Sequence, residues 1–147
     1  MILPKNMPCY NLFSCGTDAA VLISIIMIKG IGIDICGIKR LERAVKKNKR
    51  FLRRVFSERE IQYCSGKKNS ILNYAGRFAA KEAFIKAVST DKSIKLNEIE
   101  VVNNIHGKPE IVLNPVISAV LKKKKGKNLN ISISHTHDAA AAVCIIT

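Results

Sequence analysis

The chain has 147 residues, which is about the length of one domain, and 48% of them are apolar, enough to bury a core. This composition excludes a disordered tail. Lysine and arginine number 25 against 11 acidic residues, so the formal net charge is +14 and predicts an anionic partner. Tryptophan is absent and aromatic residues make up only 5%, which argues against a surface that stacks nucleic-acid bases.

The first 26 residues differ from the rest, with two prolines, two cysteines and no clear periodicity. The apolar run 19–28 is shorter than the roughly 20 residues of a membrane span. Only Lys5 precedes this run as a base and no A-x-A-like cleavage site follows it, so we do not expect a signal peptide. We expect residues 1–26 to be a dispensable extension and residues 27–147 to form the domain, beginning at Met27.

The five cysteines are odd in number, scattered, and contain no C-x-x-C pair. This pattern argues against a disulfide framework and against a structural zinc site. We therefore expect a reducing compartment, the cytoplasm.

Residues 28–35 alternate isoleucine with lysine, glycine or aspartate, and this period of two predicts a strand with Asp34 near its end. Apolar residues then recur at helical spacing from Ile38 to Val55, which predicts an amphipathic helix that a break near Asn48 could divide. One acid, Glu42, lies among nine bases on its outer face: Lys39, Arg40, Arg43, Lys46, Lys47, Lys49, Arg50, Arg53 and Arg54. We interpret this face as a docking surface for an acidic partner, with a merely solvated face as the alternative.

The remaining elements mix helices and strands without a strict alternation, so the fold class is α+β. Ser57 and Glu60 form a capping-box pattern for a short helix ending near Tyr63. Asn73 is placed to cap a longer helix over residues 74–88, after a basic loop at 66–70. The pattern then predicts a hairpin of strands 99–102 and 110–113, a helix over 116–121, a basic loop over 122–127, and strands over 130–135 and 139–146.

Two acids and a lysine stand out as candidates for chemistry. Asp34 is the lone acid of an apolar strand, and steps of four residues place Glu82 and Lys86 on one helical stripe with Tyr74 and Phe78. The aromatic residues suggest that this stripe faces inward, so Glu82 and Lys86 would be partly buried. An ordinary Glu82–Lys86 helix pair, worth about 0.2–0.5 kcal/mol, is the structural alternative.

The active hypothesis is that Asp34 and Glu82 converge on one divalent cation. Two carboxylates, together with substrate phosphate oxygens and water, are a usual way to hold Mg²⁺. Lys86 could then reach the same phosphates, and Arg77 and Lys81 would add positive charge from the flanking face.

A third place is the segment I-S-I-S-H-T-H, which ends in His135 and His137. Two histidines could bind zinc, but no third ligand of suitable spacing is near. No G-x-S-x-G elbow supports a serine hydrolase, and no P-loop or Rossmann glycine pattern is present. A hydrogen bond from His135 to a phosphate or ribose suits the segment better, and a polar strand edge is the alternative.

Four motifs in order carry a family resemblance: G-I-G-I-D-I with Arg40 behind it, A-G-R-F-A-A-K-E-A-F-I-K-A, N-x-x-G-K-P and I-S-I-S-H-T. Together they resemble the bacterial holo-acyl-carrier-protein synthases, which are 4′-phosphopantetheinyl transferases. The resemblance implies the 4′-phosphopantetheinyl transferase fold. It also implies transfer of 4′-phosphopantetheine from coenzyme A to a serine of apo acyl carrier protein, with release of adenosine 3′,5′-bisphosphate, in support of fatty acid biosynthesis.

The resemblance also implies roles for individual residues. Asp34 and Glu82 match the Mg²⁺ ligands of the family and, with Lys86 at the diphosphate, form the catalytic set. Coenzyme A binding would involve Lys86, His135 and the neighbouring bases Arg77 and Lys81. The acidic carrier protein would dock on the first basic helix at Arg40, Arg43 and Lys47. The small enzymes of this family are homotrimers with sites at subunit interfaces.

The chain departs from the family in two places. Residues 1–26 have no counterpart, and the loop at 89–92 reads Ser-Thr-Asp-Lys where the family often has G-T-G. Two other classes fit part of the sequence: a small nucleic-acid-binding protein, which the charge alone would suit, and a structural interaction module. Neither class explains the isolated acids Asp34 and Glu82, so we expect an enzyme with no nucleic-acid partner.

Overall fold

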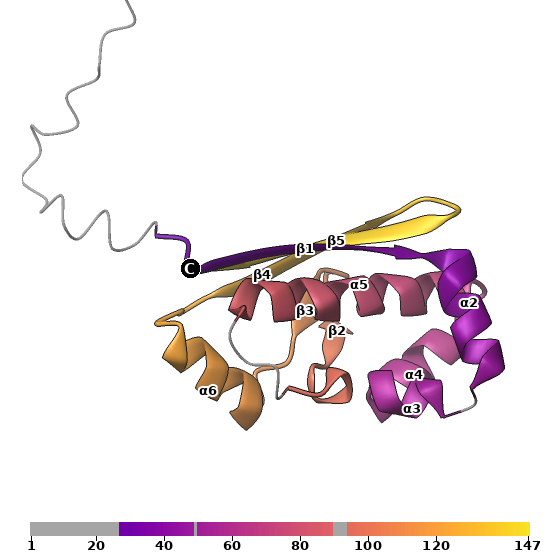
Figure 1. The fold of residues 1–147 in the computed structure, drawn as a ribbon, viewed down its shortest axis with the longest axis horizontal. Coiled ribbons are helices and arrows are strands. Elements are labelled where there is room, and N and C mark those ends of the chain that lie inside the picture. The colour runs from indigo at the N-terminus through magenta and orange to yellow at the C-terminus, as the bar shows by residue number, and fades with distance from the viewer. Residues whose placement is uncertain (1–26, 49, 90–93) are drawn as a thin grey trace, which may run out of the picture.

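The structure is a computed structural model that describes residues 27–48, 50–89 and 94–147 (Figure 1). The expected extension 1–26, Lys49 and most of the loop at 89–92 lie outside these residues, so dispensability of residues 1–26 stays a prediction. Helices and strands follow one another as β1 (Gly30–Gly37), α2 (Ile38–Lys47), α3 (Phe51–Val55), α4 (Glu58–Ser65), α5 (Ser70–Val88), a 3-10 turn η1 (Leu96–Glu98), β2 (Val101–Asn103), β3 (Pro109–Ile111), α6 (Pro115–Lys123), β4 (Leu129–His135) and β5 (Ala139–Ile146).

Three strands form an antiparallel sheet in the order β1-β5-β4, and β2 pairs with β3 in a separate hairpin. The long helix α5 runs along one face of the three-stranded sheet, with α2, α3 and α4 gathered at one end and α6 at the other (Figure 1). Antiparallel strands packed with helices confirm the predicted α+β class.

Close packing of α5 on β1 explains the glycines of the first strand. A Cβ atom on Gly30 would overlap the carbonyl oxygen of Ala87, and one on Gly32 would overlap that of Ala83. The helix backbone therefore lies directly against the strand, which only glycine permits at these positions. Since side chains alternate along a strand, Asp34 points to the same face as the two glycines.

Most predicted elements are confirmed, and their boundaries shift. The first amphipathic helix is divided between Lys47 and Phe51, as the break near Asn48 predicts. The Ser57–Glu60 capping box is present in full. The prediction that Asn73 caps the long helix is wrong: α5 starts one turn earlier, at Ser70. The predicted basic loop at 122–127 is partly helical, because α6 continues to Lys123.

The core holds a charged pair. Lys81 Nζ donates to Glu60 Oε2 at 2.6 Å, and neither side chain is exposed. The same ammonium donates to the backbone carbonyls of Val55 and Leu96. Glu60 Oε1 in turn accepts from the backbone N–H of Val101. This network connects α3, α4 and α5 with η1 and β2, and it satisfies both buried charges.

The face of the sheet opposite to α5 is apolar and open in a single chain. Ile31, Ile33 and Ile35 of β1 point to that side with exposed fractions of 63%, 62% and 68%. A row of exposed isoleucines is uncommon on a monomer and marks an interaction surface. Among the described residues, no helix is both long and apolar enough to cross a bilayer.

Candidate functional site

Asp34 and Lys86 form the centre of the candidate site. Lys86 Nζ donates to Asp34 Oδ1 at 2.8 Å and to the carbonyl oxygen of Ile33 at 2.9 Å. The Asp34 side chain is 17% exposed and that of Lys86 is 52% exposed. The expectation of a partly buried Lys86 is therefore wrong: it lies in the last turn of α5, past the end of the aromatic stripe.

Glu82 lies one turn before Lys86 on α5 and is partly buried. Burial raises the pKa of its carboxyl group, the negative charge of Asp34 raises it further, and the Lys86 ammonium lowers it. A carboxyl group whose pKa responds to both neighbours lies within electrostatic reach of both. Asp34 and Glu82 thus lie near each other, and their joint role in one site stays a prediction.

Asp34 and Glu82 line one pocket of about 380 Å³. Its other walls come from β1, α2 and the aromatic rings of Phe51 and Phe78. Two carboxylates that repel each other across one pocket are a donor set that fits a hard divalent cation. Within the described residues, no group of three or more His, Cys, Asp or Glu could hold a metal, so substrate and water would have to complete the coordination.

The basic face of α2 begins at this pocket. Arg40 lines it, and Arg40, Arg43 and Lys47 are all exposed. The acid of that face, Glu42, is paired with Lys46 at 2.7 Å. The exposed surface next to the pocket is therefore positively charged.

Arg77 and His135 line a different pocket, of about 190 Å³. Arg77 is 5% exposed; its guanidinium donates to Asn103 Oδ1 at 2.8 Å and lies 4.2 Å from the centre of the Tyr63 ring. The Arg77 Nε atom is buried with no hydrogen-bond partner. Neither Asn103 nor Tyr63 was a candidate from sequence, because they come from β2 and α4 and only the fold brings them to Arg77.

Helix α5 separates these two pockets. Asp34 pairs with Ala142 of β5, which pairs with Ile133 of β4, so the strands of the two pockets are separated by β5. Glu82 faces the β1 side of α5, whereas a Cβ on Gly76 would meet Ile133 on the β4 side. The two pockets share no lining residue. A single chain therefore does not bring Arg77 and His135 to the Asp34–Glu82 pocket.

The predicted role of Lys81 in coenzyme A binding does not fit its surroundings. Its side chain is fully buried, and Glu60 and two backbone carbonyls accept its three hydrogen bonds. An ammonium has three donors, so none remains for a ligand. Lys81 belongs to the core, and the one-residue step from Glu82 explains the difference, since neighbours on a helix point about 100° apart.

The N-x-x-G-K-P motif forms the hairpin turn between β2 and β3. Asn104 Oδ1 accepts from the backbone N–H groups of His106 and Lys108, and Gly107 has a φ of +79°, which favours glycine. The turn lets the Asn103 side chain bond to both Arg77 and the carbonyl of Gly107.

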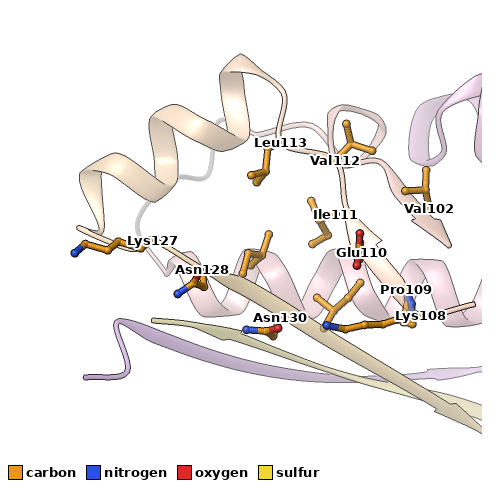
Figure 2. Close-up of a pocket in the computed structure, with 12 residues that line it drawn as sticks. Val102, Lys108, Pro109, Glu110, Ile111, Val112, Leu113, Lys127, Asn128 and Asn130 are labelled. Atoms are coloured by element: carbon orange, nitrogen blue, oxygen red, sulfur yellow. The ribbon is translucent and has the colours of Figure 1, made fainter. Parts of the chain in front are cut away.

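A groove of about 730 Å³ lies between β3 and the start of β4 (Figure 2). Lys108 and Glu110 come to it from the hairpin, Lys127 and Asn128 from the segment leading into β4, and Asn130 from β4 itself. None of the predicted catalytic residues lines this groove, and its one acid, Glu110, also bonds to Asn104. We assign no reaction to it.

The chain is similar to known proteins of the family that its sequence motifs resemble. A family model of the 4′-phosphopantetheinyl transferase superfamily matches residues 30–144. The holo-[acyl-carrier-protein] synthase of Cytophaga hutchinsonii is 48% identical over 97 residues, which cover 65% of this chain and 76% of the relative. The synthase of Geotalea daltonii is 49% identical over 90 residues, covering 59% and 72%.

Solved structures agree. The holo-[acyl-carrier-protein] synthase from Neisseria meningitidis superposes with a TM-score of 0.76 at 32% identity, covering 82% of this chain and 99% of that one. The synthase from Helicobacter pylori in complex with coenzyme A gives 0.67 at 36% identity, covering 80% and 99%. Because the family model spans residues 30–144 and the fold agrees over 82% of the chain, the chain belongs to the 4′-phosphopantetheinyl transferase superfamily.

Proposed function

We propose that this protein is a holo-[acyl-carrier-protein] synthase. It transfers 4′-phosphopantetheine from coenzyme A to a serine of apo acyl carrier protein and releases adenosine 3′,5′-bisphosphate, as a cytoplasmic step that supports fatty acid biosynthesis. One observation carries the proposal: Asp34 and Glu82 line one pocket beside Lys86, next to the exposed basic helix α2. The names of the relatives and the coenzyme A complex of the Helicobacter pylori synthase support it. The buried, unpaired thiols of Cys36, Cys64 and Cys144 fit a reducing compartment.

Asp34 and Glu82 would hold a Mg²⁺ ion. Burial raises the pKa of the Glu82 carboxyl group and the charge of Asp34 raises it further, and a cation between the two acids would offset both effects. When bound, the ion would neutralise charge that develops on the diphosphate during transfer. Lys86 lies beside the pocket, bonded to Asp34 with its side chain half exposed, so its ammonium can reach phosphate oxygens near the two acids.

The carrier protein would dock on α2. Acyl carrier proteins are acidic, and Arg40, Arg43 and Lys47 present exposed positive charge next to the Asp34–Glu82 pocket. Such complementarity speeds encounter and fixes orientation. Docking there would direct the acceptor serine toward the pocket.

We further propose a homotrimer whose sites are shared between subunits. Arg77 and His135 are the coenzyme A residues that α5 separates from Asp34 within one chain. A second chain could supply them to the first, and the open isoleucine face of β1 offers a surface for that contact. The assembly would therefore complete the coenzyme A site and cover the exposed isoleucines together.

A mass assay tests the reaction. Full-length protein is incubated with coenzyme A, Mg²⁺ and apo acyl carrier protein, and the carrier is weighed by mass spectrometry. The wild type should add one phosphopantetheine, and Asp34→Ala and Glu82→Ala should each lower kcat by at least about a hundredfold, as loss of a group that stabilises developing charge does. Asn97→Ala, an exposed change on η1, is the control. Near-normal turnover in both acid variants would contradict the assignment.

A further inference from the structure

The bond between Lys86 and Asp34 uses an oxygen that a metal ion would need. The ammonium lies 2.8 Å from Asp34 Oδ1, and its second bond, to the carbonyl of Ile33, holds it there. The Asp34 side chain is only 17% exposed and carries a single negative charge, which the bound ammonium already compensates against a cation that enters from the pocket. Lys86 and a metal ion held by Asp34 would therefore compete for one charge.

Lys86 can also leave Asp34. Its side chain is 52% exposed and belongs to the last turn of α5, two residues before the helix ends at Val88. A lysine ammonium has three donors, of which the two observed bonds use two. The side chain can thus turn toward an anion in the pocket without any movement of the helix.

We propose that Lys86 couples the binding of a divalent cation at Asp34 to the binding of a diphosphate. Without the anion, the ammonium compensates Asp34 and weakens cation binding; a diphosphate attracts the ammonium and leaves Asp34 to the cation. This inference rests on the proposed function, which supplies the diphosphate as part of coenzyme A. Coupling of this kind is reciprocal, so the cation must tighten coenzyme A binding by the same factor as coenzyme A tightens cation binding.

Other positive groups near the pocket lack this arrangement. Arg40 lines the same pocket and is exposed on α2, but the bond to Asp34 is made by Lys86. Lys46 is exposed on the same helix and paired with Glu42. Removing the Lys46 charge lowers the net charge by the same amount as removing that of Lys86, which makes Lys46 a matched control.

The experiment measures the affinity of full-length protein for Mn²⁺ from the electron paramagnetic resonance signal of the free ion, with and without coenzyme A. In the wild type, coenzyme A should tighten Mn²⁺ binding by about tenfold, within the usual range of coupling. Lys86→Met should tighten Mn²⁺ binding without coenzyme A and lose most of the tenfold effect. Lys86→Gln should repeat this result, and Lys46→Met should behave as the wild type.

Two results would overturn the coupling: unchanged or weaker Mn²⁺ binding by both Lys86 variants without coenzyme A, or an undiminished effect of coenzyme A in them. Thermal unfolding is the control for folding: each variant should keep a cooperative transition, because the replaced side chain is half exposed. The mass assay on the wild type separates a failure of the proposed coupling from a failure of the proposed function. Metal-dependent carrier modification with no change in Mn²⁺ affinity on loss of Lys86 rejects only the coupling. Absence of modification by wild type rejects the function itself.

Discussion

Glu82 is held in surroundings that disfavour its charge. Burial and the neighbouring Asp34 raise the pKa of its carboxyl group above the usual value in the folded protein. An acid whose pKa is raised by folding destabilises the protein where it is ionised, that is, at pH values above its folded pKa. Binding sites commonly carry such a cost, because a ligand rather than the fold compensates the charge.

We therefore predict that Glu82→Gln raises the Tm at pH 7 in the presence of a chelator. The difference from wild type should shrink as the pH falls through the raised pKa and vanish below about pH 4, where Glu82 is protonated in both the folded and the unfolded chain. Differential scanning calorimetry over this range measures the effect. A variant less stable than wild type at pH 7 would contradict it.

Individual site residues were predictable where the local pattern isolates them. Asp34 stands alone in an apolar strand, and Glu82 follows the aromatic stripe of its helix. Lys81 was assigned wrongly because its partner, Glu60, belongs to another helix and sequence spacing does not reveal that pairing. Asn103 and Tyr63 were missed for the same reason: each contacts Arg77 only through tertiary packing.

At the scale of elements, the Glu60–Lys81 pair fixes how α5 is rotated. Lys81 is bonded to Glu60 of α4 and to the carbonyls of Val55 in α3 and Leu96 in η1, while Glu82 faces the pocket beside β1. Burial lowers the pKa of the Lys81 ammonium, and the Glu60 carboxylate opposes that shift. The buried pair and the close contact of α5 with Gly32 hold Glu82 toward Asp34 from opposite sides.

Loss of one partner of this pair should be costly. Lys81→Met leaves the Glu60 carboxylate buried without its cation, and we predict a loss of about 3–5 kcal/mol in the free energy of unfolding. Urea denaturation measures it. The double variant Glu60→Gln/Lys81→Met should recover part of the loss because no buried charge remains. A single variant within about 1 kcal/mol of wild type would refute a structural role for the pair.

The basic face of α2 should matter for one substrate only. We predict that Arg40→Glu/Arg43→Glu raises KM for the carrier protein by more than tenfold and leaves KM for coenzyme A nearly unchanged, because rim charges act mainly on encounter and orientation. Steady-state kinetics at low salt measure both constants. Lys122→Glu/Lys125→Glu changes the net charge equally at the opposite end of α5 and serves as the control (Figure 1). Equal effects of both pairs would show a response to total charge.

Element boundaries were harder to predict than element types. The helix over 74–88 begins at Ser70 in the structure because Ile71 and Leu72 also pack against the core, and that packing outweighs the polar signal of Asn69 and Asn73. Each hairpin strand reaches one residue nearer to the turn than predicted, to Asn103 and Pro109, and loses two residues at its far end, where Ile99 instead caps η1. The continuous apolar run of β5 was predicted to the residue, whereas the bounds of the alternating strands β1 and β4 shift by one or two residues.

For the whole molecule, the fold class could be predicted from the sequence. The placement of Asp34 and His135 in two different pockets could not. Period-two strands and amphipathic helices predict an α+β domain. That α5 lies between Asp34 and His135 depends on the strand order β1-β5-β4, which no local pattern specifies. The separation of Asp34 from His135 within one chain therefore became visible only in the structure, whereas sites at subunit interfaces were implied by the family resemblance alone.

Shared sites predict complementation between inactive variants. Asp34→Ala damages one pocket and His135→Ala the other, so co-expressed chains in mixed trimers should rebuild sites from one intact half of each. With random mixing at equal amounts, about a quarter of the sites should be intact, and activity should reach that fraction of wild type. The mass assay on co-purified, differently tagged chains measures it. Activity no higher than the sum of the separate variants would contradict sharing between subunits.

The position of α5 between two unlike pockets has a further consequence, one of counting. If sites are shared between subunits, each chain contributes the Asp34–Glu82 pocket to one site and the Arg77–His135 pocket to another. Two subunits joined head to tail complete one site and leave two pockets without a partner, whereas a closed ring leaves none. The last subunit to join would complete two sites at once, so activity would rise more steeply than the amount of assembled protein.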